Sequence, residues 1–194
     1  MRLYVDMDGV LTQCHYAALM YHDVILTEWP QGKYVQQILI EHGHTEFEKL
    51  SRREFWATYS EGFWRHLKKT AICDNLLGTC GWIVGRENVF IATLPAAHQG
   101  CWGGKYAWVL DNLPEWIHDQ VIMIQGGKEA LAKPDTILID DNESNVDAFA
   151  DAGGVGILMP QPWNGNAHDS QAVINTLPEI LNIAKNRVRA QCGL

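Results

Sequence analysis

The sequence has no surplus of positive charge and no long apolar run. Its 194 residues include 15 Lys and Arg against 23 Asp and Glu, which gives a formal net charge of −8. General binding to nucleic acid is therefore disfavoured, because phosphate backbones attract an excess of basic side chains. No apolar stretch reaches the roughly 18 residues that a membrane span needs, so we expect no membrane partner. With 47% hydrophobic and 20% charged residues, the chain has the composition of a folded globular domain.

Paired cysteine motifs are also missing. The five cysteines are odd in number and include no CxxC pair, which argues against a disulfide framework and against a zinc knuckle. We therefore expect reduced thiols. The first residues run directly into an apolar segment at 3–5, without the basic stretch, apolar core and small-residue cleavage site of a leader. A cytoplasmic location is the expectation from this pattern.

Short apolar runs that end in polar or turn residues recur along the chain. Five of these runs are β-prone, at residues 3–5, 88–93, 120–124, 136–140 and 154–159. Between them, residues 104–113 and 143–152 repeat apolar side chains at helical spacing. This alternation predicts an α/β fold, in which helices cover both faces of a mostly parallel sheet. Ligands bind such sheets at the carboxyl ends of the strands.

Residues 14–85 interrupt the alternation. They contain no clear buried strand and are rich in aromatic and charged residues with helical patterns. We interpret this segment as a helical cap inserted after the first strand. The predicted core then consists of residues 1–13 and 86–194. Its tail, residues 172–183, is predicted to pack on the core as a helix interrupted by Pro178.

Two carboxylates follow the first strand, in Asp6-Met7-Asp8-Gly9-Val10. Side chains two residues apart on an extended chain point to the same side, so Asp6 and Asp8 can act together. Such a pair can hold a hard divalent cation, and one carboxylate can attack phosphorus while the other transfers protons. The alternative is an ordinary turn, because Asp and Gly are both common turn residues.

Polar residues also end two later strands. Asp140 and Asp141 close one of them, and adjacent acids repel unless a cation neutralises them. A helix N-cap is the alternative for this pair, since Asp favours that position. Thr93 closes another strand and can donate a hydrogen bond to a phosphate oxygen. Lys128 and Lys133 both precede Asp140, and either ammonium group could reach the phosphate from a loop.

Taken in order, these motifs resemble the four motifs of the haloacid dehalogenase superfamily of phosphatases. The resemblance covers residues 1–13 and 86–160 and implies a Rossmann-like core. It also implies that Asp6 is the nucleophile that becomes an aspartyl phosphate. Asp8 is then the acid that protonates the leaving oxygen and afterwards activates water.

The resemblance further implies that Thr93 and a lysine bind the phosphate. In the family pattern this lysine comes soon after a strand. Lys128 directly follows Gly126-Gly127 and is preferred for that reason, while Lys133 stays as the alternative.

The same resemblance implies Mg²⁺ as the cofactor. Its ligands would be the Asp6 carboxylate, the main-chain carbonyl of Asp8 and a carboxylate of the fourth motif. For that carboxylate Asp141 is preferred and Asp140 is the alternative. The ion would offset the repulsion among the acids and the phosphate, so that an anionic nucleophile can approach.

Within the superfamily, three stretches are similar to the 5′(3′)-deoxyribonucleotidases. They are Glu61-Gly62-Phe63-Trp64, Phe90-Ile91-Ala92-Thr93-Leu94-Pro95 and Lys105-Tyr106-Ala107-Trp108-Val109. Aromatic cap residues enclose the nucleobase in those enzymes. This implies that Phe63 and Trp64 form a base platform, with Phe55 and Trp56 as support. The alternative is that these aromatic side chains form the core of the cap itself.

Together these resemblances imply a magnesium-dependent phosphatase of nucleoside monophosphates, with a deoxyribonucleotide as the expected substrate. Leu94 and Cys14 depart from the nucleotidase pattern, which leaves base and sugar preference open. A phosphatase of sugar phosphates or of polynucleotide ends is the second hypothesis. The third is a catalytically silent protein that binds a nucleotide or a protein partner, although retention of Asp6 and Asp8 argues against it. A homodimer is left open.

Overall fold

The computed structural model describes residues 1–164 and 170–192. Within these residues, five strands form one parallel sheet in the order β3-β2-β1-β4-β5. The strands are β1 (Arg2–Val5), β2 (Val89–Thr93), β3 (Val121–Met123), β4 (Thr136–Asp140) and β5 (Val155–Leu158). Each strand coincides with one of the apolar runs of the sequence, so the predicted α/β fold with a parallel sheet is confirmed.

The helices lie between and beyond the strands. They are α1 (Cys14–Tyr21), α2 (Val35–Glu41), α3 (Arg52–Ala57), α4 (Glu61–Arg65), α5 (Cys73–Val84), α6 (Gln99–Asn112), α7 (Glu143–Asp151) and α8 (Ser170–Cys192). Shorter 3-10 segments occupy Thr45–Phe47, Arg86–Asn88, Glu115–Ile117, Lys128–Leu131 and Pro162–Asn164. Helix α6 begins ahead of its predicted start at residue 104, because its first turns are rich in glycine, which weakens the helical signal in the sequence.

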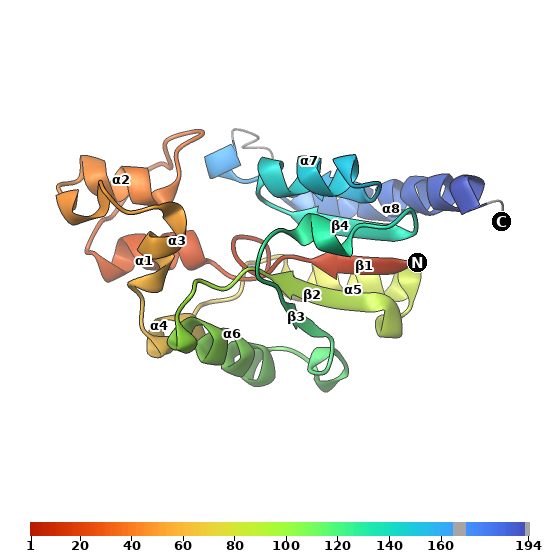
Figure 1. Ribbon diagram of the computed structural model, residues 1–194, viewed down its shortest axis with the longest axis horizontal. Coiled ribbons are helices and arrows are strands. Elements are labelled where there is room, and N and C mark those ends of the chain that lie inside the picture. The colour runs from red at the N-terminus through yellow and green to blue at the C-terminus, as the bar shows by residue number, and fades with distance from the viewer. Residues whose placement is uncertain (165–169, 193–194) are drawn as a thin grey trace.

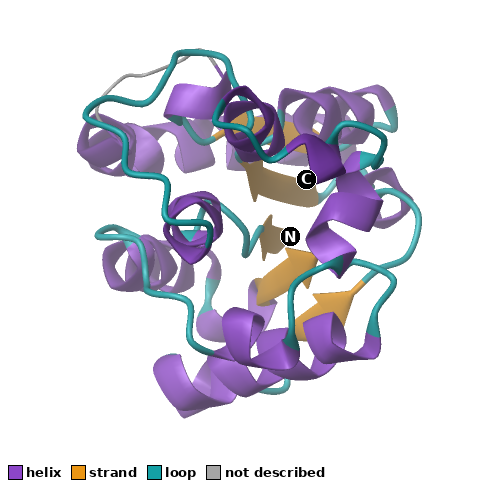
Figure 2. Ribbon diagram, turned by 90° about the vertical axis from the view of Figure 1, so that its left-hand side faces the viewer, coloured by secondary structure: helices purple, strands orange, loops and turns teal. Residues whose placement is uncertain are grey.

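The two faces of the sheet bury alternate residues of each strand. On β1, Leu3 and Val5 are fully buried in the larger hydrophobic cluster, which also holds the buried residues of α5 and α8. Tyr4 points to the other face, where its ring packs edge-on against Phe149 of α7 with centroids 6.3 Å apart. Figure 2 shows the strands in the middle of the molecule with helices around them. This arrangement leaves the strand ends as the accessible edge of the core.

The tail forms the long helix α8, which continues through Pro178. Leu177, Leu181 and Ala184 are buried, and the helix contacts α5. The apolar positions predicted at 172–174 lie outside the residues whose side chains are described. Among the described residues, no helix is both long enough and apolar enough to cross a membrane.

Helices α1 to α4 stand at the carboxyl ends of the strands. In Figure 1 they lie on the left, and the arrow of β1 points toward them. Serine side chains start two of these short helices: Ser51 forms a capping box with Glu54 at α3, and Ser60 accepts a hydrogen bond from the Phe63 N–H at α4. The segment predicted as a helical cap therefore covers the edge where a parallel sheet binds its ligands.

Helix α5 contacts β1, β2 and α8, so it covers the sheet, although residues 14–85 were all assigned to the predicted cap. A short ribbon of two chain segments separates it from α1 to α4. In this ribbon the Gln13 N–H donates to the Lys68 carbonyl, and the Thr70 N–H donates to the Leu11 carbonyl, both at 2.9 Å. We propose that the cap ends at this ribbon and that α5 belongs to the core.

The cap also touches the core where α4 packs on α6. A Cβ atom on Gly104 of α6 would lie 2.5 Å from the Glu61 carbonyl oxygen and 2.7 Å from the Trp64 Cβ. Only a residue without a side chain allows the two helices this approach. The docking of the cap therefore depends on a glycine in the helix that follows β2.

Candidate active site

The loop after β1 folds back tightly on itself. The Gly9 N–H donates to the Thr12 carbonyl at 3.0 Å, and the N–H groups of Leu11 and Thr12 both donate to the Met7 carbonyl at 2.9 Å. Gly9 has a φ of +75°, and a Cβ there would lie 2.2 Å from Asp141 Oδ2. A glycine is thus required both by the backbone conformation and by the close approach of a carboxylate.

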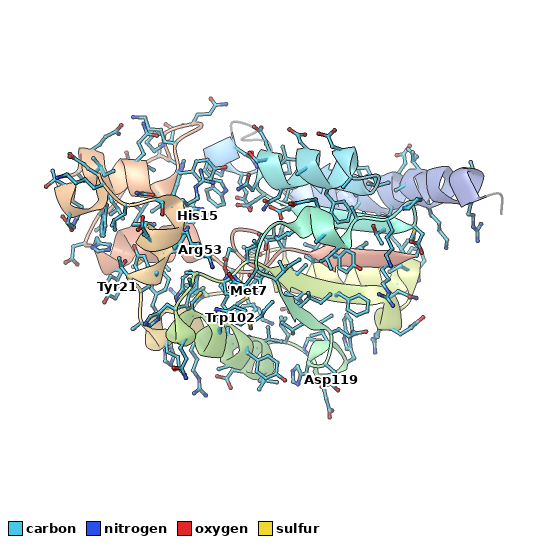
Figure 3. The ribbon with its side chains drawn as sticks, in the orientation of Figure 1. Met7, His15, Tyr21, Arg53, Trp102 and Asp119 are labelled. Atoms are coloured by element: carbon cyan, nitrogen blue, oxygen red, sulfur yellow. The ribbon has the colours of Figure 1, made fainter. Side chains whose placement is uncertain are left out.

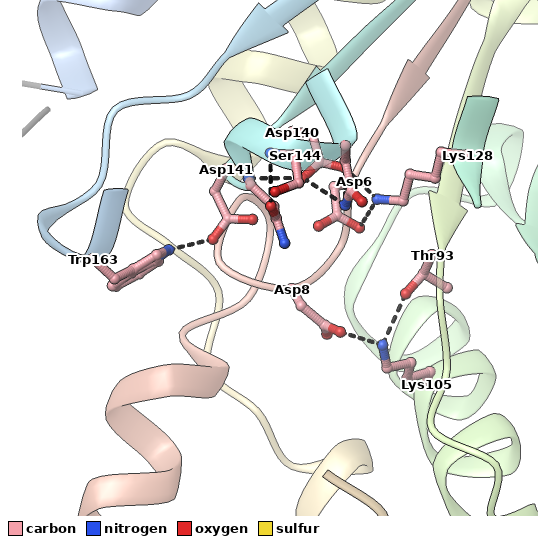
Figure 4. A network of polar contacts seen from close by, with 11 residues as sticks. Asp6, Asp8, Thr93, Lys105, Lys128, Asp140, Asp141, Ser144 and Trp163 are labelled. Carbon is pink, nitrogen blue, oxygen red and sulfur yellow. Dashed lines mark hydrogen bonds and ion pairs between the residues drawn. The ribbon is translucent and has the colours of Figure 1, made fainter. Parts of the chain in front are cut away.

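Three buried carboxylates meet at the ends of β1 and β4. Asp6, Asp140 and Asp141 each offer an oxygen atom, and these atoms lie within 4.8 Å of one another. The two strands pair side by side in the sheet, which explains why their ends converge. Lys128 Nζ lies 2.6 Å from Asp6 Oδ1 and 2.6 Å from Asp140 Oδ2 (Figure 4). One ammonium group therefore bridges two of the three acids.

Burial and nearby negative charge raise the pKa values of two of these acids, Asp6 and Asp141. Burial, together with the charges of Asp140 and Asp8, raises the pKa of Asp6 to about 7 against the opposing charge of Lys128. Burial and the charge of Asp140 likewise raise the pKa of Asp141 well above its usual value. A divalent cation among these oxygens would lower both pKa values by neutralising the charge. The donor set, all carboxylate oxygen, fits a hard ion such as Mg²⁺.

The two adjacent acids at the end of β4 have different surroundings. Asp140 is completely buried, and its oxygens accept hydrogen bonds from Lys128, from the Asn145 side chain and from the Asn142 N–H. Asp141 accepts a hydrogen bond from Trp163 Nε1 and lines a cavity. The Asn142 side chain, rather than either Asp, caps α7. The N-cap alternative for the acid pair is therefore wrong.

A second lysine, Lys105, forms an ion pair with Asp8, the second acid of the loop after β1. Lys105 of α6 is completely buried, and its Nζ forms an ion pair with Asp8 Oδ2 and donates to Thr93 Oγ1 at 2.8 Å. Burial opposes the charge on Lys105, but chiefly Asp8 raises its pKa above the usual value. Asp8 Oδ1 is buried without a hydrogen-bond partner among the described residues. That oxygen therefore has unused capacity to bind or carry a proton.

Two adjoining cavities open above the acids. One, of about 190 Å³, is lined by Asp6, Asp8, His15, Tyr34, Arg52, Trp56, Leu94, Lys128, Asp141, Asn142 and Asn145. The other, of about 270 Å³, is lined by Asp8, Arg52, Arg53, Trp56, Trp64, Leu94, Pro95, Ala96, Ile124, Gln125 and Gly126. Four residues line both cavities: Asp8 and Leu94 at the strand ends, and Arg52 and Trp56 of the cap. The space therefore lies between the strand ends and the cap.

An aromatic wall closes the smaller cavity on the cap side. The His15 ring stacks on Trp163 with centroids 4.1 Å apart and meets Trp56 edge-on at 5.5 Å. Burial, with the nearby charge of Arg52, lowers the pKa of His15 to about 3, so this imidazole is neutral at pH 7. In Figure 3 His15 and Arg53 lie where the cap faces the strand ends, near Met7.

The predicted base platform divides into two parts. Trp64 lines the larger cavity, and Trp56 lines both. Phe63 lines neither; its ring packs on Tyr59 with centroids 4.2 Å apart, so its contacts are those of a cap core residue. Phe55 is completely buried among cap aromatic rings. Trp64 is buried, with Lys105 Nζ 4.9 Å from its ring centroid, so it contributes only its edge to the cavity. The geometry thus supports the platform interpretation best for Trp56, and the alternative interpretation for the phenylalanines.

The structure also decides which predicted lysine lies at the acids and adds residues that sequence reasoning missed. Lys133 is exposed, whereas Lys128 is buried between two acids. The sequence singles out Lys105 only as part of a stretch that is similar to the nucleotidases. The feature that distinguishes it is that Lys105 is the one charged residue among the buried residues of α6. Arg52 and His15 gave no signal of their own, because only the tertiary fold brings them to the cavities.

Comparison with known proteins agrees with this geometry. The family model described as "5' nucleotidase, deoxy (Pyrimidine), cytosolic type C protein" matches residues 1–187. A solved dehalogenase structure superposes with a TM-score of 0.51 at 11% identity, covering 91% of this chain and 96% of that one. No curated protein matches the sequence.

Two further solved structures are similar at lower scores. A haloacid dehalogenase (HAD) family enzyme from Bacteroides thetaiotaomicron, in complex with magnesium and inorganic phosphate, is 15% identical with a TM-score of 0.42, over 83% of this chain and 94% of that one. A β-phosphoglucomutase from Clostridium difficile is 13% identical with a TM-score of 0.43, over 93% and 98%.

The family model covers almost the entire chain, and the motifs of the superfamily lie at the ends of the strands as the sequence predicted. The sheet, the cap and the acidic cluster form one continuous unit within the matched residues. The chain belongs to the family of 5′-nucleotidases described as deoxy (pyrimidine), cytosolic type C, which are phosphoric monoester hydrolases of the haloacid dehalogenase superfamily.

Proposed function

We propose that the protein is a magnesium-dependent, cytoplasmic phosphatase of nucleoside monophosphates, and specifically a 5′(3′)-deoxyribonucleotidase. The observation that carries this proposal is the cluster of Asp6, Asp140 and Asp141 around Lys128, at the ends of paired strands and beneath an aromatic cap. Membership in a nucleotidase family supports the nucleotide as substrate.

Asp6 is the proposed nucleophile. Its carboxylate attacks phosphorus, the bond between phosphorus and the ester oxygen breaks, and an aspartyl phosphate forms. Asp8 gives a proton to the departing oxygen, which leaves as the alcohol of the nucleoside. In the second step Asp8 takes a proton from water, the water oxygen attacks phosphorus, and inorganic phosphate leaves Asp6. The unpartnered Asp8 Oδ1 is suited to carry this proton.

Lys128 and Thr93 hold the phosphate in this proposal. Burial works against the charge of Lys128, but Asp6 and Asp140 raise its pKa, so the ammonium group stays charged beside the nucleophile. Thr93 accepts a hydrogen bond from Lys105, which leaves its own hydroxyl proton for a phosphate oxygen. Lys105 is a positioning residue that orients Asp8 and Thr93 together.

Mg²⁺ is the proposed cofactor, held by the carboxylates of Asp6 and Asp141 and by the main-chain carbonyl of Asp8. It supplies positive charge that offsets the repulsion between nucleophile and phosphate. Asp141 is preferred as the direct ligand because it lines the cavity, whereas the oxygens of Asp140 are occupied by three donor groups.

Trp56 and Trp64 are the proposed base platform. Both line the cavity above Asp8, and stacking a base on an aromatic ring is worth about 1–3 kcal/mol. The cap helices that carry these two rings contribute none of the acids at the strand ends. Substrate choice is therefore assigned to the cap and the chemistry to the strand ends.

Phosphate release from a substrate panel tests this proposal. The panel contains deoxy- and ribonucleoside 5′- and 3′-monophosphates, sugar phosphates and p-nitrophenyl phosphate, each with Mg²⁺ and with EDTA. Asp6→Asn protein is the blank. Magnesium-dependent release concentrated on deoxynucleotides supports the proposal. Release only from sugar phosphates would keep the chemistry and reject the nucleotidase, and no release from any ester would reject both.

A further inference from the structure

Two adjacent arginines of the cap face the proposed substrate cavity. Arg52 lines both cavities above the acids, and Arg53 lines the larger one. Both are the first residues of α3, in a chain whose net charge is −8. Cations placed at a cavity of an acidic protein call for an explanation by a ligand, because a general basic surface is absent.

The guanidinium group of Arg52 is held in place by the Tyr34 side chain, through a ring contact and a hydrogen bond to the phenolic oxygen. Its Cζ atom lies 3.8 Å from the centroid of the Tyr34 ring. A guanidinium group stacked on an aromatic face still has N–H groups along its edge that can bind an anion through two bonds. Tyr34 lines the same cavity, so this edge is presented at the cavity wall.

Arg52 has no carboxylate partner among the side chains that the structure describes. No Asp or Glu oxygen of these residues lies within 4.0 Å of a nitrogen of Arg52. Of the three acids that line the cavities, Asp6 pairs with Lys128 and Asp8 pairs with Lys105, while Asp141 is the proposed ligand of the metal ion. The guanidinium group of Arg52 therefore forms no ion pair with the acids of the cavity.

The second arginine is engaged differently. Arg53 Nη2 donates a hydrogen bond to the Gln125 side chain, which belongs to the loop after β3. This contact ties the start of α3 to the core at the rim of the larger cavity. Arg52, next to it on α3, is exposed and lines the smaller cavity together with Asp6 and Lys128.

We propose that Arg52 forms a second anion subsite, so that the preferred substrates carry another negatively charged group away from the phosphate that is hydrolysed. This inference rests on the proposed function and narrows its substrate class. The shared chemistry is a planar or tetrahedral oxyanion, which is either a second phosphate on the sugar or a carboxylate on the base. A guanidinium group binds both through paired N–H bonds.

Matched substrate pairs test the subsite. The phosphate pair is deoxythymidine 5′-monophosphate and deoxythymidine 3′,5′-bisphosphate, and the carboxylate pair is uridine 5′-monophosphate and orotidine 5′-monophosphate. We expect kcat/KM to be roughly tenfold or more higher for the doubly anionic member of one pair, as for a charge-assisted hydrogen bond. The pair that shows the difference identifies the source of the second anion.

Arg52→Gln should remove this preference through KM while leaving kcat and the hydrolysis of p-nitrophenyl phosphate unchanged within about twofold. Lys49→Gln removes a cation from an exposed cap position outside both cavities and should keep the preference. A wild-type enzyme without preference in either pair would overturn the inference. So would an Arg52→Gln protein that loses the same factor on all esters, because Arg52 would then contact the hydrolysed phosphate.

Binding without turnover separates this inference from the proposed function. Calorimetric titration of Asp6→Asn protein with the two deoxythymidine nucleotides and the two pyrimidine ribonucleotides measures affinity alone. Tighter binding of a doubly anionic member, lost when Arg52→Gln is added, supports the subsite even if no ester is hydrolysed. Equal affinities within both pairs would refute the subsite even if the enzyme proves to be a nucleotidase.

Discussion

The strand ends and the cap hold their side chains in different ways. At the strand ends, acids and lysines fix one another by ion pairs, and every group has a polar neighbour within the same cluster. In the cap, aromatic rings contact aromatic rings, and three buried polar atoms, His22 Nε2, Tyr59 Oη and Trp64 Nε1, have no hydrogen-bond partner among the described residues. Satisfied charge networks specify one arrangement, whereas apolar packing tolerates replacements that conserve volume.

The two regions therefore respond differently to substitution. A substitution at the strand ends removes a charge that others depend on, so chemistry and stability both respond. A substitution in the cap changes the shape of an apolar wall, so binding responds first. The predictions below test that division.

The largest expected effect is loss of turnover in Asp6→Asn. The amide cannot attack phosphorus, so kcat should fall by roughly a thousandfold or more, as for other nucleophile replacements. The fold should persist, because the side chains are isosteric. Steady-state phosphate release and a thermal melt measure both. Asp119→Asn, at an exposed position, is the matched control. Asp6→Asn protein with a tenth of wild-type kcat would refute the nucleophile assignment.

Lys128→Met should damage stability as well as activity. It leaves two buried carboxylates without their cation, and breaking a buried pair costs about 3 kcal/mol or more. Urea unfolding at pH 7 in EDTA measures this free energy. The same replacement at exposed Lys133 should cost less than about 0.5 kcal/mol and leave kcat/KM intact. Equal effects at the two lysines would contradict the comparison.

In the cap, Trp56→Leu should raise KM without changing the chemistry. Loss of one stacking ring corresponds to a KM increase of roughly tenfold for deoxynucleotides. KM for p-nitrophenyl phosphate, which has no base, should stay within about twofold. Phe63→Leu is the matched control, since that ring lines neither cavity. A common loss of kcat in both variants would mean that the cap takes part in the chemistry.

A further expected effect is on the pH dependence of stability. Without metal, the native Asp6 keeps its proton up to about pH 7, while the unfolded carboxyl loses it near its ordinary pKa of 3.8. The native state then binds more protons, so stability should fall as pH rises from about 4 to 7.

Thermal melts in EDTA across this range measure the slope. Added Mg²⁺ should flatten it, because the ion stabilises the ionised native site. Asp6→Asn should flatten it as well, with or without Mg²⁺. A slope that is identical in wild-type and Asp6→Asn proteins would place the proton uptake elsewhere.

The core was predictable from the sequence because local patterns determine it. Each strand is a short apolar run, and parallel pairing alone brings Asp6 beside Asp140 and Asp141. The predicted cap boundary at residue 85 differs from the one we propose, because periodicity alone does not place α5. An amphipathic helix such as α5 has the same periodicity whether it packs on a sheet or on cap helices.

The residues that sequence reasoning missed are placed by contacts between distant segments. Lys105 meets Asp8 across 97 residues of the chain, and His15 stacks on Trp163. The residues next to Lys105 and His15 in the sequence give no indication of these partners. The sequence alone does not separate Phe63 from Trp64 for a related reason. Successive residues of a helix point in different directions, so adjacent rings rarely line the same cavity.

The contact between α4 and α6 at Gly104 also constrains how this enzyme can diverge. The residue next to Gly104 is Lys105, so any side chain that pushed the two helices apart would also displace the ammonium group from Asp8. Substitution of the aromatic residues and arginines that line the cavities is therefore an easier route to a new substrate specificity than a change in the angle at which the cap docks on the core. The substrate range can change in this way while the catalytic residues, and with them kcat, stay the same.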